Sequence, residues 1–568
     1  MQGRTLRRLR LASQVVFLLL FVVLLLRTEF PGSIRSATTD VRIPYPVGLF
    51  LETDPLVAIA TALSSWTLYR NLVWAVPLLL LAILVGRAFC GWVCPLGTLN
   101  HFFGSLKSEQ KRGVALIASN RYKRWQAAKY YILAAVLAMA LAGSVTGLFL
   151  DPLSFLVRSF AVSVVPTINY ALRSGLDAVD RVPYEPVRLL GNGLSFVLNA
   201  TVLTFKQPHF GQAALIGGLF VFVLVLNVRV TRFWCRAICP LGALLGVCSR
   251  WSLVQLDKHD GQCNDCRLCL LHCQGGDDPI PGATWRKAEC HLCMNCLADC
   301  KEGGLSFHWG TSPARTTRET PQLQRRAVMT GLASGAVLVP LLRSGPGLKA
   351  AADPLLIRPP GALDESHFLE RCIRCGDCMK VCPNNALHPA LFEGGVEGLW
   401  SPVLVPRVGY CEPNCVLCSQ VCPTGAIWEI TVAEKTGRPA PAGEVSFAPP
   451  GTDSAAPAGE PIRIGTAFYD RGRCLPWAMC TECIVCEEWC PTSPKAIYLV
   501  AADVIDSRGQ VKTVRQPYVD PRLCTGCGAC EYACPIKGRP AVYVTNAGES
   551  RSRSNQFLLQ ENQPQQRS

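Results

Sequence analysis

Residues 524–535 read Cys-Thr-Gly-Cys-Gly-Ala-Cys-Glu-Tyr-Ala-Cys-Pro. Four cysteines set this closely cannot all pair with one another as disulfides. Runs of this kind occur six times along the 568 residues and use 24 of the 30 cysteines. The runs are Cys263, Cys266, Cys269 and Cys273; Cys290, Cys293, Cys296 and Cys300; Cys372, Cys375, Cys378 and Cys382; Cys411, Cys415, Cys418 and Cys422; Cys480, Cys483, Cys486 and Cys490; and Cys524, Cys527, Cys530 and Cys534.

The spacing of these runs is that of the cysteines that ligate [4Fe–4S] clusters in bacterial ferredoxins. Three cysteines on one tight loop reach one cluster, and the fourth reaches the cluster of a neighbouring run, so that runs work in pairs. We therefore predict that the 24 cysteines are the iron ligands of six [4Fe–4S] clusters, in loop-rich α+β domains of the bacterial-ferredoxin type. Cys248 and Cys474 complete no run and are predicted to be structural.

Zinc, radical chemistry and haem do not fit the spacing of the cysteines. Zinc sites use cysteine pairs separated by longer stretches. Cys411-x3-Cys415-x2-Cys418 matches the spacing of radical enzymes that use S-adenosylmethionine, but Cys422-Pro423 completes a run of the common type. The sequence has no C-x-x-C-H haem motif, no G-x-G-x-x-G and no phosphate-binding loop, so neither haem nor flavin is expected.

The first 343 residues differ in charge from the rest of the chain. They hold 35 Lys and Arg against 18 Asp and Glu, whereas residues 344–568 hold 21 against 23. In the whole chain 17% of residues are charged, below the roughly 25% of soluble domains, and the mean hydropathy is +0.24. A basic half that also holds the apolar runs indicates a membrane protein and makes nucleic-acid binding a poor account of the charge.

Four apolar runs predict helices that span a lipid bilayer: residues 11–26, 72–89, 130–150 and 213–228. The loops at 1–10, 104–129 and 229–250 carry 15 Lys and Arg in 58 residues, against nine in the 107 residues of loops 27–71 and 151–212. The denser set is predicted to be cytoplasmic, which places the N-terminus and residues 251–310 inside the cell.

The two predicted helix pairs carry the same signatures, which indicates a repeated four-helix unit. Cys90-x3-Cys94-Pro ends the second helix, and Cys235-x3-Cys239-Pro ends the fourth. These four cysteines could bind a metal, exchange electrons as disulfides or line a site. Gly-Leu-Phe-Leu lies shortly before Asp54-Pro and again before Asp151-Pro. The two aspartates either cap the helices that follow or handle protons.

A fifth apolar stretch follows Arg325-Arg326 and continues to Leu342. It resembles a twin-arginine signal, which exports proteins already folded around a cofactor. It could equally be a membrane anchor with two flanking arginines, or a buried helix in the cytoplasm. The signal and the anchor both place the residues after this stretch outside the cytoplasm.

The predicted fold is thus a membrane α-helical unit with a fifth signal or anchor helix, joined to iron–sulfur domains. The predicted domains are the membrane domain at 1–250, a two-cluster module at 251–310, a linker and signal or anchor helix at 311–345, a ferredoxin module at 346–433, a Pro/Ala/Gly-rich linker at 434–470, a second module at 471–546 and a disordered tail at 547–568.

These parts resemble two families. Residues 1–310, with their paired Cys-x3-Cys-Pro motifs, resemble the NapH/MauN membrane ferredoxins. Residues 320–545 resemble the NapG/MauM four-cluster ferredoxins, in particular at Ile357-Arg-Pro-Pro-Gly-Ala-Leu and Cys372-Ile-Arg-Cys-Gly-Asp-Cys. The chain resembles a fusion of the two over nearly its whole length.

The resemblance implies a bacterial inner-membrane protein that oxidises quinol and passes electrons to a periplasmic redox protein, terminal reductase or dehydrogenase. Residues 346–568 would then be periplasmic, and Cys90, Cys94, Cys235 and Cys239 would link the quinone site to the clusters. The alternatives are a copper reductase that assembles oxidases, reverse flow that reduces quinone from a low-potential donor, and a non-catalytic scaffold. Whether the chain is an enzyme or only an electron carrier stays open at this point.

Overall fold

The computed structural model describes residues 2–29, 42–43, 45–105, 114–203, 207–258, 262–264, 266–275, 285–300, 302–310, 323–344, 353–438, 460–505, 507–552 and 555–557. The described residues form two compact units. The helical unit comprises those of 1–29, 44–344 and 369–377, and the C-terminal unit comprises those of 30–43, 345–368 and 378–568.

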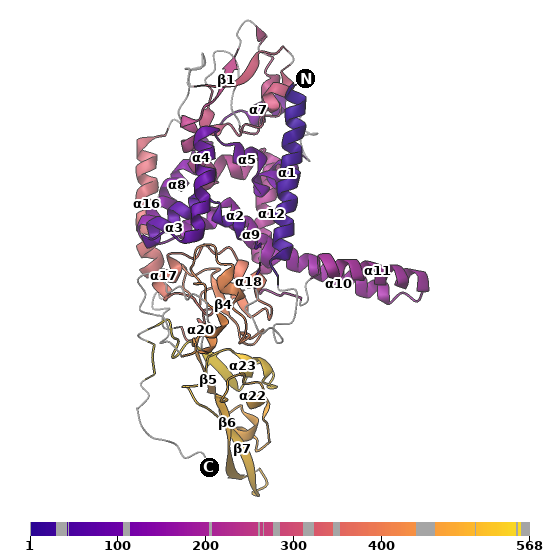
Figure 1. Ribbon diagram of the computed structural model, residues 1–568, viewed down its shortest axis with the longest axis vertical. Helices are drawn as coiled ribbons and strands as arrows, with labels where there is room; N and C mark the ends of the chain where they lie inside the picture. Colours follow the sequence, from indigo (N-terminus) through magenta and orange to yellow (C-terminus); the bar gives the residue numbers. More distant parts are fainter. Residues whose placement is uncertain are drawn as a thin grey trace. The chain divides into compact units, whose positions relative to one another are not determined.

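The helical unit is built mainly from apolar helices (Figure 1). Its helices are α1 (Gln2–Arg27), α2 (Leu49–Glu52), α3 (Pro55–Ser65), α4 (Ala75–Leu84), α5 (Ala88–Trp92), α6 (Pro95–Ser105), α7 (Val114–Asn120), α8 (Ala128–Leu141), α9 (Pro152–Ser159), α10 (Val165–Asp180), α11 (Glu185–Thr201), α12 (Ala213–Arg229), α13 (Phe233–Ala237), α14 (Pro240–Cys248), α15 (Asn295–Asp299) and α16 (Arg325–Ser344). Strands β1 (Val254–Lys258) and β2 (Leu305–Trp309) pair antiparallel.

The helices differ from the four predicted spans in two ways. The predicted helices at 72–89 and 130–150 are shorter, because Gly86 (φ +112°) follows the end of α4 and Gly143 (φ +79°) follows the end of α8. The predicted loops at 27–71 and 151–212 hold α3 and α9 to α11. The charge pattern gave no sign of these helices, because their polar residues lie among apolar ones.

Three helices are long and apolar enough to cross a membrane by length and composition: Gly3–Arg27, Pro152–Asp180 and Arg325–Arg343. Shorter apolar helices cover Pro55–Ser65, Arg70–Leu84 and Ala213–Arg229. Of the three long helices, the charge and hydropathy pattern predicted the first and the last.

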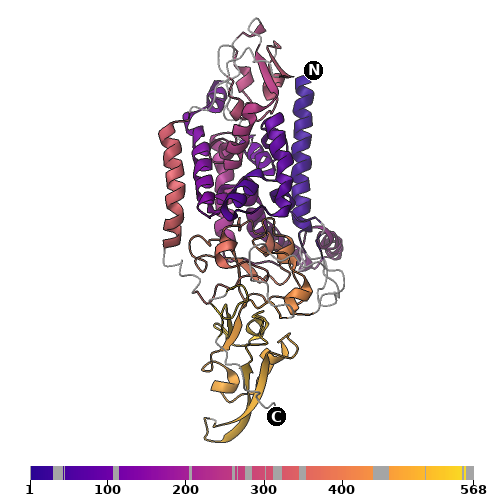
Figure 2. The same cartoon turned by 60° about the vertical axis from the view of Figure 1, so that its left-hand side comes forward.

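Helix α16 packs along α8, and Figure 2 shows the two side by side. The approach is close because α16 presents Gly331 and Gly335, one helical turn apart. A Cβ atom at Gly335 would lie 2.3 Å from the carbonyl oxygen of Ala135, and one at Gly331 would lie 2.9 Å from that of Tyr131. Small residues at this spacing let helix backbones come together. The helix after Arg325-Arg326 is therefore an integrated part of the helical unit.

We expect Gly335→Leu to displace α16 from α8 and to lower the thermal unfolding midpoint of the purified protein by several degrees, because overpacking costs about 1–3 kcal/mol. The matched control is Gly218→Leu in α12, where a Cβ atom meets nothing within 4 Å. Unfolding followed by circular dichroism measures both variants. Equal midpoints for the two would contradict the packing of α16 on α8.

The C-terminal unit is rich in loops and holds short helices and two-stranded antiparallel pairs. Its elements are α17 (Glu365–Leu369), α18 (Asp377–Val381), β3 (Leu387–Pro389), β4 (Pro402–Leu404), α19 (Leu417–Gln420), α20 (Val432–Thr436), β5 (Thr466–Tyr469), α21 (Leu475–Ala478), α22 (Val485–Glu488), β6 (Ile497–Ile505), β7 (Val511–Val519), α23 (Ala529–Ala533) and β8 (Val542–Thr545). The last residue of α17 and the first of α18 are assigned to the helical unit. The pairs are β3 with β4, β5 with β8, and β6 with β7.

Two predicted boundaries change in this unit. The segment 434–470, predicted as a linker, contains part of α20 and all of β5, and only 439–459 lies outside the described residues. The predicted disordered tail begins too early at 547, because Arg551 donates to the carboxylate of Glu549 at 2.7 Å and to that of Glu365 at 2.9 Å. Residues 558–568 of that tail lie outside the described residues.

Candidate metal centres

Cysteines from the last two runs line one cavity in the C-terminal unit. Cys524, Cys527 and Cys530 come from the loop before and the start of α23, and Cys490 comes from the preceding run. Three ligands from one run and the fourth from its partner is the arrangement that the spacing predicts. The remaining lining is largely apolar, so the site fits a [4Fe–4S] cluster held by four thiolates.

A second cavity differs from the predicted ligand set in one lining cysteine. It is lined by Cys483, Cys486 and Cys534, and by Cys474 in place of Cys480. The Cys480 thiol instead donates to the carbonyl oxygen of Ile505 at 3.6 Å. The structure therefore places Cys474, which the sequence predicts to be a structural cysteine, on the wall of a candidate cluster site.

The local backbone explains why Cys474 reaches this cavity. The Cys474 N–H donates to the carbonyl of Asp470 at 3.2 Å, and the Cys524 N–H donates to that of Asp520 at 3.1 Å. Both cysteines thus follow the same turn, Asp-x3-Cys, and occupy equivalent positions in the two halves of the module. This shared lead-in was visible in the sequence and could have identified Cys474.

A third site adjoins the first. The thiols of Cys411, Cys415 and Cys418 lie close enough to that of Cys382 to interact electrostatically, so that Cys382 of the third run lies beside the fourth run, as shared ligands would require. The Cys411 N–H donates to the carbonyl of Cys527 at 2.8 Å. The three sites of the C-terminal unit therefore follow one another without an intervening domain. Of the remaining cysteines in these two runs, Cys372 and Cys375 belong to the helical unit, and Cys378 and Cys422 to the C-terminal unit.

The buried side chain of Lys435 lies against the third site. Its Nζ donates to the Cys411 Sγ at 3.1 Å and to the carbonyls of Glu412 and Cys415, both at 2.7 Å. Lys435 was not predicted as a site residue, because it lies in the stretch 434–470 that the sequence predicts to be a linker. Net charge and hydrogen bonds to sulfur set the reduction potential of an iron–sulfur cluster. Lys435 is thus placed to raise the potential at this site.

We expect Lys435→Met to lower the midpoint potential of that cluster by tens of millivolts, because loss of a neighbouring positive charge favours the oxidised state. Lys435→Arg keeps the positive charge, so its midpoint potential should lie much closer to that of the wild type. A redox titration followed by electron paramagnetic resonance measures the shift. A Met variant with wild-type potentials throughout would contradict the assigned contact.

The helical unit holds a further set of cysteines from the first two runs. The thiol of Cys296 interacts with those of Cys269, Cys273, Cys290 and Cys293. The two runs are also joined by the Asn295 side chain, which donates to the carbonyl of His272 at 2.8 Å. These contacts bring five of the eight predicted ligands together.

The loop of the second run packs directly on α5. The Trp92 Nε1–H donates to the carbonyl of Leu292 at 2.9 Å. A Cβ atom at Gly91 would lie 2.2 Å from the carbonyl oxygen of His291, so only glycine fits there. Cys90, the neighbour of Gly91 in α5, therefore lies beside the iron–sulfur module at 285–300.

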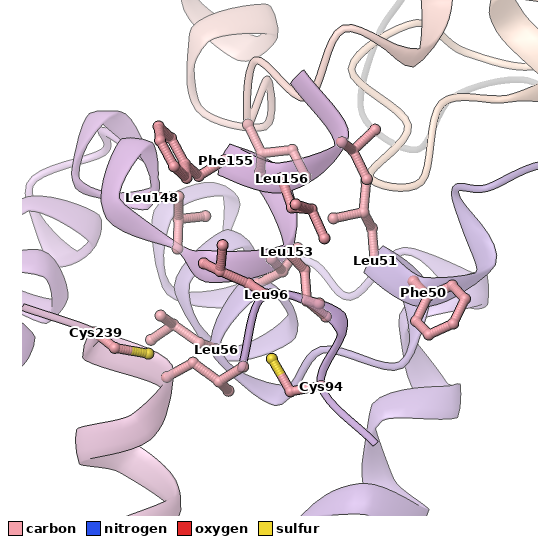
Figure 3. Close-up of a cluster of buried hydrophobic side chains, with 14 of the residues drawn as sticks. Phe50, Leu51, Leu56, Cys94, Leu96, Leu148, Leu153, Phe155, Leu156 and Cys239 are labelled. Atoms are coloured by element: carbon pink, nitrogen blue, oxygen red, sulfur yellow. The ribbon is translucent and has the colours of Figure 1, made fainter. Parts of the chain in front are cut away.

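The four cysteines of the Cys-x3-Cys-Pro motifs come together in the buried core of the helical unit. The thiol of Cys239 interacts electrostatically with those of Cys90, Cys94 and Cys235. All four side chains are at most 7% exposed. Figure 3 shows the sulfur atoms of Cys94 and Cys239 directed toward one another beside Leu56. The two motifs, 145 residues apart in the chain, thus contribute to one cluster of thiols.

Asp54 and Asp151 are both helix N-caps. Asp54 Oδ1 accepts from the N–H of Leu56 at 2.8 Å, and Asp151 Oδ2 accepts from that of Ser154 at 2.8 Å. Each aspartate is fully buried and is followed by proline at the first helical position, an arrangement that begins α3 and α9. The two carboxyl groups also interact with each other. Capping accounts for the recurrence of Asp-Pro in the sequence.

Three protein-family models match the chain, one of them twice. One family model, described as a "4Fe-4S binding domain", matches residues 67–114 and again residues 210–258. These two segments contain the two Cys-x3-Cys-Pro motifs. A second model of the same description matches residues 367–388. A "4Fe-4S dicluster domain" matches residues 479–537. No solved structure matches.

Curated relatives point the same way. The chain is 30% identical over 231 residues to the methylamine utilization ferredoxin-type protein MauM of Paracoccus denitrificans, covering 40% of this chain and 87% of that protein. It is 29% identical over 197 residues to the ferredoxin-type protein NapG of Escherichia coli (34% of this chain, 72% of NapG). It is 27% identical over 225 residues to the putative electron transport protein YccM of Escherichia coli (40% and 52%). With its interlocked cysteine sites and these relatives, the chain belongs to the family of the MauM and NapG ferredoxin-type iron–sulfur proteins.

Proposed function

We propose that this chain is an inner-membrane electron-transfer protein that oxidises quinol and delivers the electrons to a redox partner on the far side of the membrane. That the chain is an iron–sulfur electron-transfer protein of the ferredoxin type follows from its family and its cysteine sites. The proposal that it carries electrons from quinol across the membrane is supported by one helix of the helical unit, which contacts cysteine-containing segments at both of its ends.

Helix α8 contacts a cysteine-containing segment near each of its two ends. At its N-terminal end the side chain of Lys129 forms a buried ion pair with Glu289, which directly precedes Cys290. Just beyond its C-terminal end Thr146 accepts a hydrogen bond from Arg374 at 3.2 Å, between Cys372 and Cys375. The 14 residues of α8 extend about 21 Å at a rise of 1.5 Å per residue. Iron–sulfur segments at both ends of an apolar helix support electron transfer along the helical unit.

The membrane assignment is supported by the three long apolar helices and by the excess of Lys and Arg in the loops at 1–10, 104–129 and 229–250. In this orientation residues 251–310 face the cytoplasm. The α16 helix then returns the chain across the bilayer, and residues 353–557 face the periplasm. Because α16 packs on α8 through Gly331 and Gly335, we propose that it remains as an anchor, whether or not Arg325-Arg326 is read as a twin-arginine signal.

Charged side chains of this chain contact the cysteine sites and their loops. When bound, each [4Fe–4S] cluster supplies oxidation and reduction by one electron. Lys435 places a positive charge beside Cys411, and Arg374 and Arg158 hold the loop of Cys372 and Cys375 through the hydrogen bond from Arg158 to the Arg374 carbonyl at 3.3 Å. Quinol would give up two electrons and two protons, and clusters held by the cysteine sites would take up the electrons one at a time.

Anaerobic mixing with quinol tests this function. The oxidised protein, purified in detergent, is mixed with a reduced menaquinol analogue, and the visible absorbance of the iron–sulfur clusters is followed together with electron paramagnetic resonance. We expect reduction at catalytic rates. Protein that dithionite reduces but quinol does not would overturn quinol oxidation and would favour the reverse direction, in which quinone is reduced from a low-potential donor.

A further inference from the structure

Asp54 and Asp151 follow the two copies of Gly-Leu-Phe-Leu, and helix capping uses only part of each side chain. Asp54 Oδ1 and Asp151 Oδ2 accept from the first N–H groups of α3 and α9. The other oxygens, Asp54 Oδ2 and Asp151 Oδ1, are buried and accept from no donor among the described residues. Serine or asparagine caps a helix equally well. Capping therefore does not explain why two carboxyl groups stand at these positions.

The two carboxyl groups, here called the carboxyl pair, lie in hydrogen-bond contact with each other. An ionised carboxylate has only acceptor oxygens, so a hydrogen bond between two carboxyl groups requires a proton on one of them. Both side chains are fully buried, and two negative charges this close in an apolar core cannot both persist. The carboxyl pair therefore shares one proton and carries one negative charge.

Two of the charged groups on the helices that pack against α3 and α9 are engaged elsewhere. Glu52 of α2 accepts from the Asn71 side chain at 2.9 Å, and Lys129 of α8 forms its ion pair with Glu289. The other titratable side chains of these neighbouring elements are Arg70 in the turn before α4, His101 on α6, Tyr130 and Tyr131 on α8, Arg229 on α12 and Cys248 on α14.

The carboxyl pair lies close to the four thiols of the Cys-x3-Cys-Pro motifs. Asp54 accepts from the N–H of Leu56, and Figure 3 shows the Leu56 side chain beside Cys94 and Cys239. Leu56, Cys94 and Cys239 belong to one continuous buried core. The segments that carry these thiols match the "4Fe-4S binding domain" model. A [4Fe–4S] cluster bound there would supply a place for one additional electron.

The buried arginines beside these thiols cannot take up a proton when an electron arrives. Arg87 of the first motif lies next to Gly242 of the second, and Arg232 of the second lies next to Gly97 of the first. Both are fully buried, and arginine is always protonated in proteins. The carboxyl pair can respond, because an added negative charge nearby favours the neutral form of a carboxyl group, most strongly in a core of low dielectric constant.

A second contact leads from the carboxyl pair to the loop of Cys372 and Cys375. Arg158 of α9 interacts electrostatically with both Asp151 and Cys375, and it donates to the Arg374 carbonyl at 3.3 Å. As an arginine it offsets negative charge but cannot accept a proton. One residue on each side, Leu56 or Arg158, therefore connects the carboxyl pair to a group of cysteines.

We propose that Asp54 and Asp151 form a proton-binding site, which shares one proton in the oxidised protein and takes up a second proton when an electron enters the neighbouring cysteine sites. An O–H bond forms on the remaining carboxylate as the electron arrives, and it breaks again when the electron leaves. Under chemical reduction the proton comes from water. That it comes from quinol during turnover, where a quinol O–H bond breaks, rests on the proposed function.

Infrared difference spectroscopy of the full chain in detergent, reduced with dithionite, tests this site without quinol. We expect the C=O stretching band of a protonated carboxylic acid to grow on reduction and to shift in D2O. The double variant Asp54→Asn, Asp151→Asn should lose this change, because asparagine keeps both helix caps but binds no proton. Asp353→Asn is the control, since Asp353 also accepts from a backbone N–H, that of Leu355, but lies outside this core. It should keep the change.

The pH dependence of the midpoint potentials gives a second readout, in redox titrations followed by electron paramagnetic resonance. One iron–sulfur signal of the wild type should fall in potential as the pH rises, because its reduction takes up a proton, and this dependence should be lost in the double variant. A wild-type infrared spectrum without a carboxylic acid change on reduction would overturn the proposal, even if the variant does not fold. A change that persists in the folded double variant would overturn it as well. Neither readout depends on quinol, so both separate this site from a failure of the proposed function.

Discussion

Cys474→Ser is expected to remove one cluster from the C-terminal unit, with a loss of about four irons per chain, whereas Cys480→Ser is expected to keep the full number. The reason is the cavity in which Cys474, and not Cys480, joins Cys483, Cys486 and Cys534. Cys480 directs its thiol to the Ile505 carbonyl instead. Spacing alone predicts the opposite result, so the pair of variants separates the two assignments.

Iron and sulfide analysis of the two purified variants, beside the wild type, provides the measurement. Serine at both positions makes the chemical change identical, and each variant is the control of the other. Retention of every cluster in Cys474→Ser, together with loss of one in Cys480→Ser, would show that Cys480 is the ligand.

Arg358→Met is expected to lower the free energy of unfolding of the C-terminal unit by about 3–5 kcal/mol, the cost of breaking a buried ion pair. Arg358 is fully buried and donates from Nε to the Glu365 carboxylate at 3.1 Å and from Nη1 to the Ser401 hydroxyl and the Pro402 carbonyl, both at 2.8 Å. Its loss leaves Glu365 with Arg551 alone and deprives two further groups of their donor.

Denaturant unfolding followed by circular dichroism measures this change under anaerobic conditions. Arg522→Met, at an exposed position, is the control and should change stability by no more than about 0.5 kcal/mol. A loss of less than about 1 kcal/mol for Arg358→Met would contradict the central role of this residue in the unit.

The same network predicts a pH dependence. Burial alone would raise the pKa of Glu365, but Arg358 and Arg551 outweigh burial and lower it to about 2. An unfolded glutamate has a pKa of about 4.3. The stabilisation from Glu365 is therefore present above about pH 4.3 and is lost as the pH falls toward 2. The difference in stability between wild type and Glu365→Gln should shrink over that window, and a difference independent of pH would contradict the assignment.

The cysteine spacing predicted more of the site than any other feature. It predicted that the runs work in pairs and left open which run pairs with which. In the structure Cys490 lines the same cavity as Cys524, Cys527 and Cys530. The spacing could not identify Cys474, because Cys474 lies nine residues before Cys483, the next cysteine on the same cavity, and so falls outside the close spacing of the run. The spacing could not identify Lys435 either, since its contact with Cys411 depends on the tertiary packing of α20.

Hydropathy predicted the helical unit only in outline. The charge-flanked helices α1 and α16 were evident, whereas α9 and α10 were not, because Arg158 and Asn169 interrupt the apolar pattern of a helix that is largely buried in protein. The motif repeat indicated that Cys90, Cys94, Cys235 and Cys239 act together. It could not show that Arg87 and Arg232 exchange partners between the motifs, since that depends on tertiary packing.

Quinol oxidation by this protein can be measured directly in a sealed bilayer. The protein is reconstituted in vesicles that contain a menaquinol analogue in the membrane, with ferricyanide, which does not cross the membrane, on the side of the C-terminal unit. We expect two ferricyanide ions to be reduced for each quinol oxidised, at a rate proportional to the amount of iron-loaded protein. A rate equal to that of vesicles without protein would contradict this expectation.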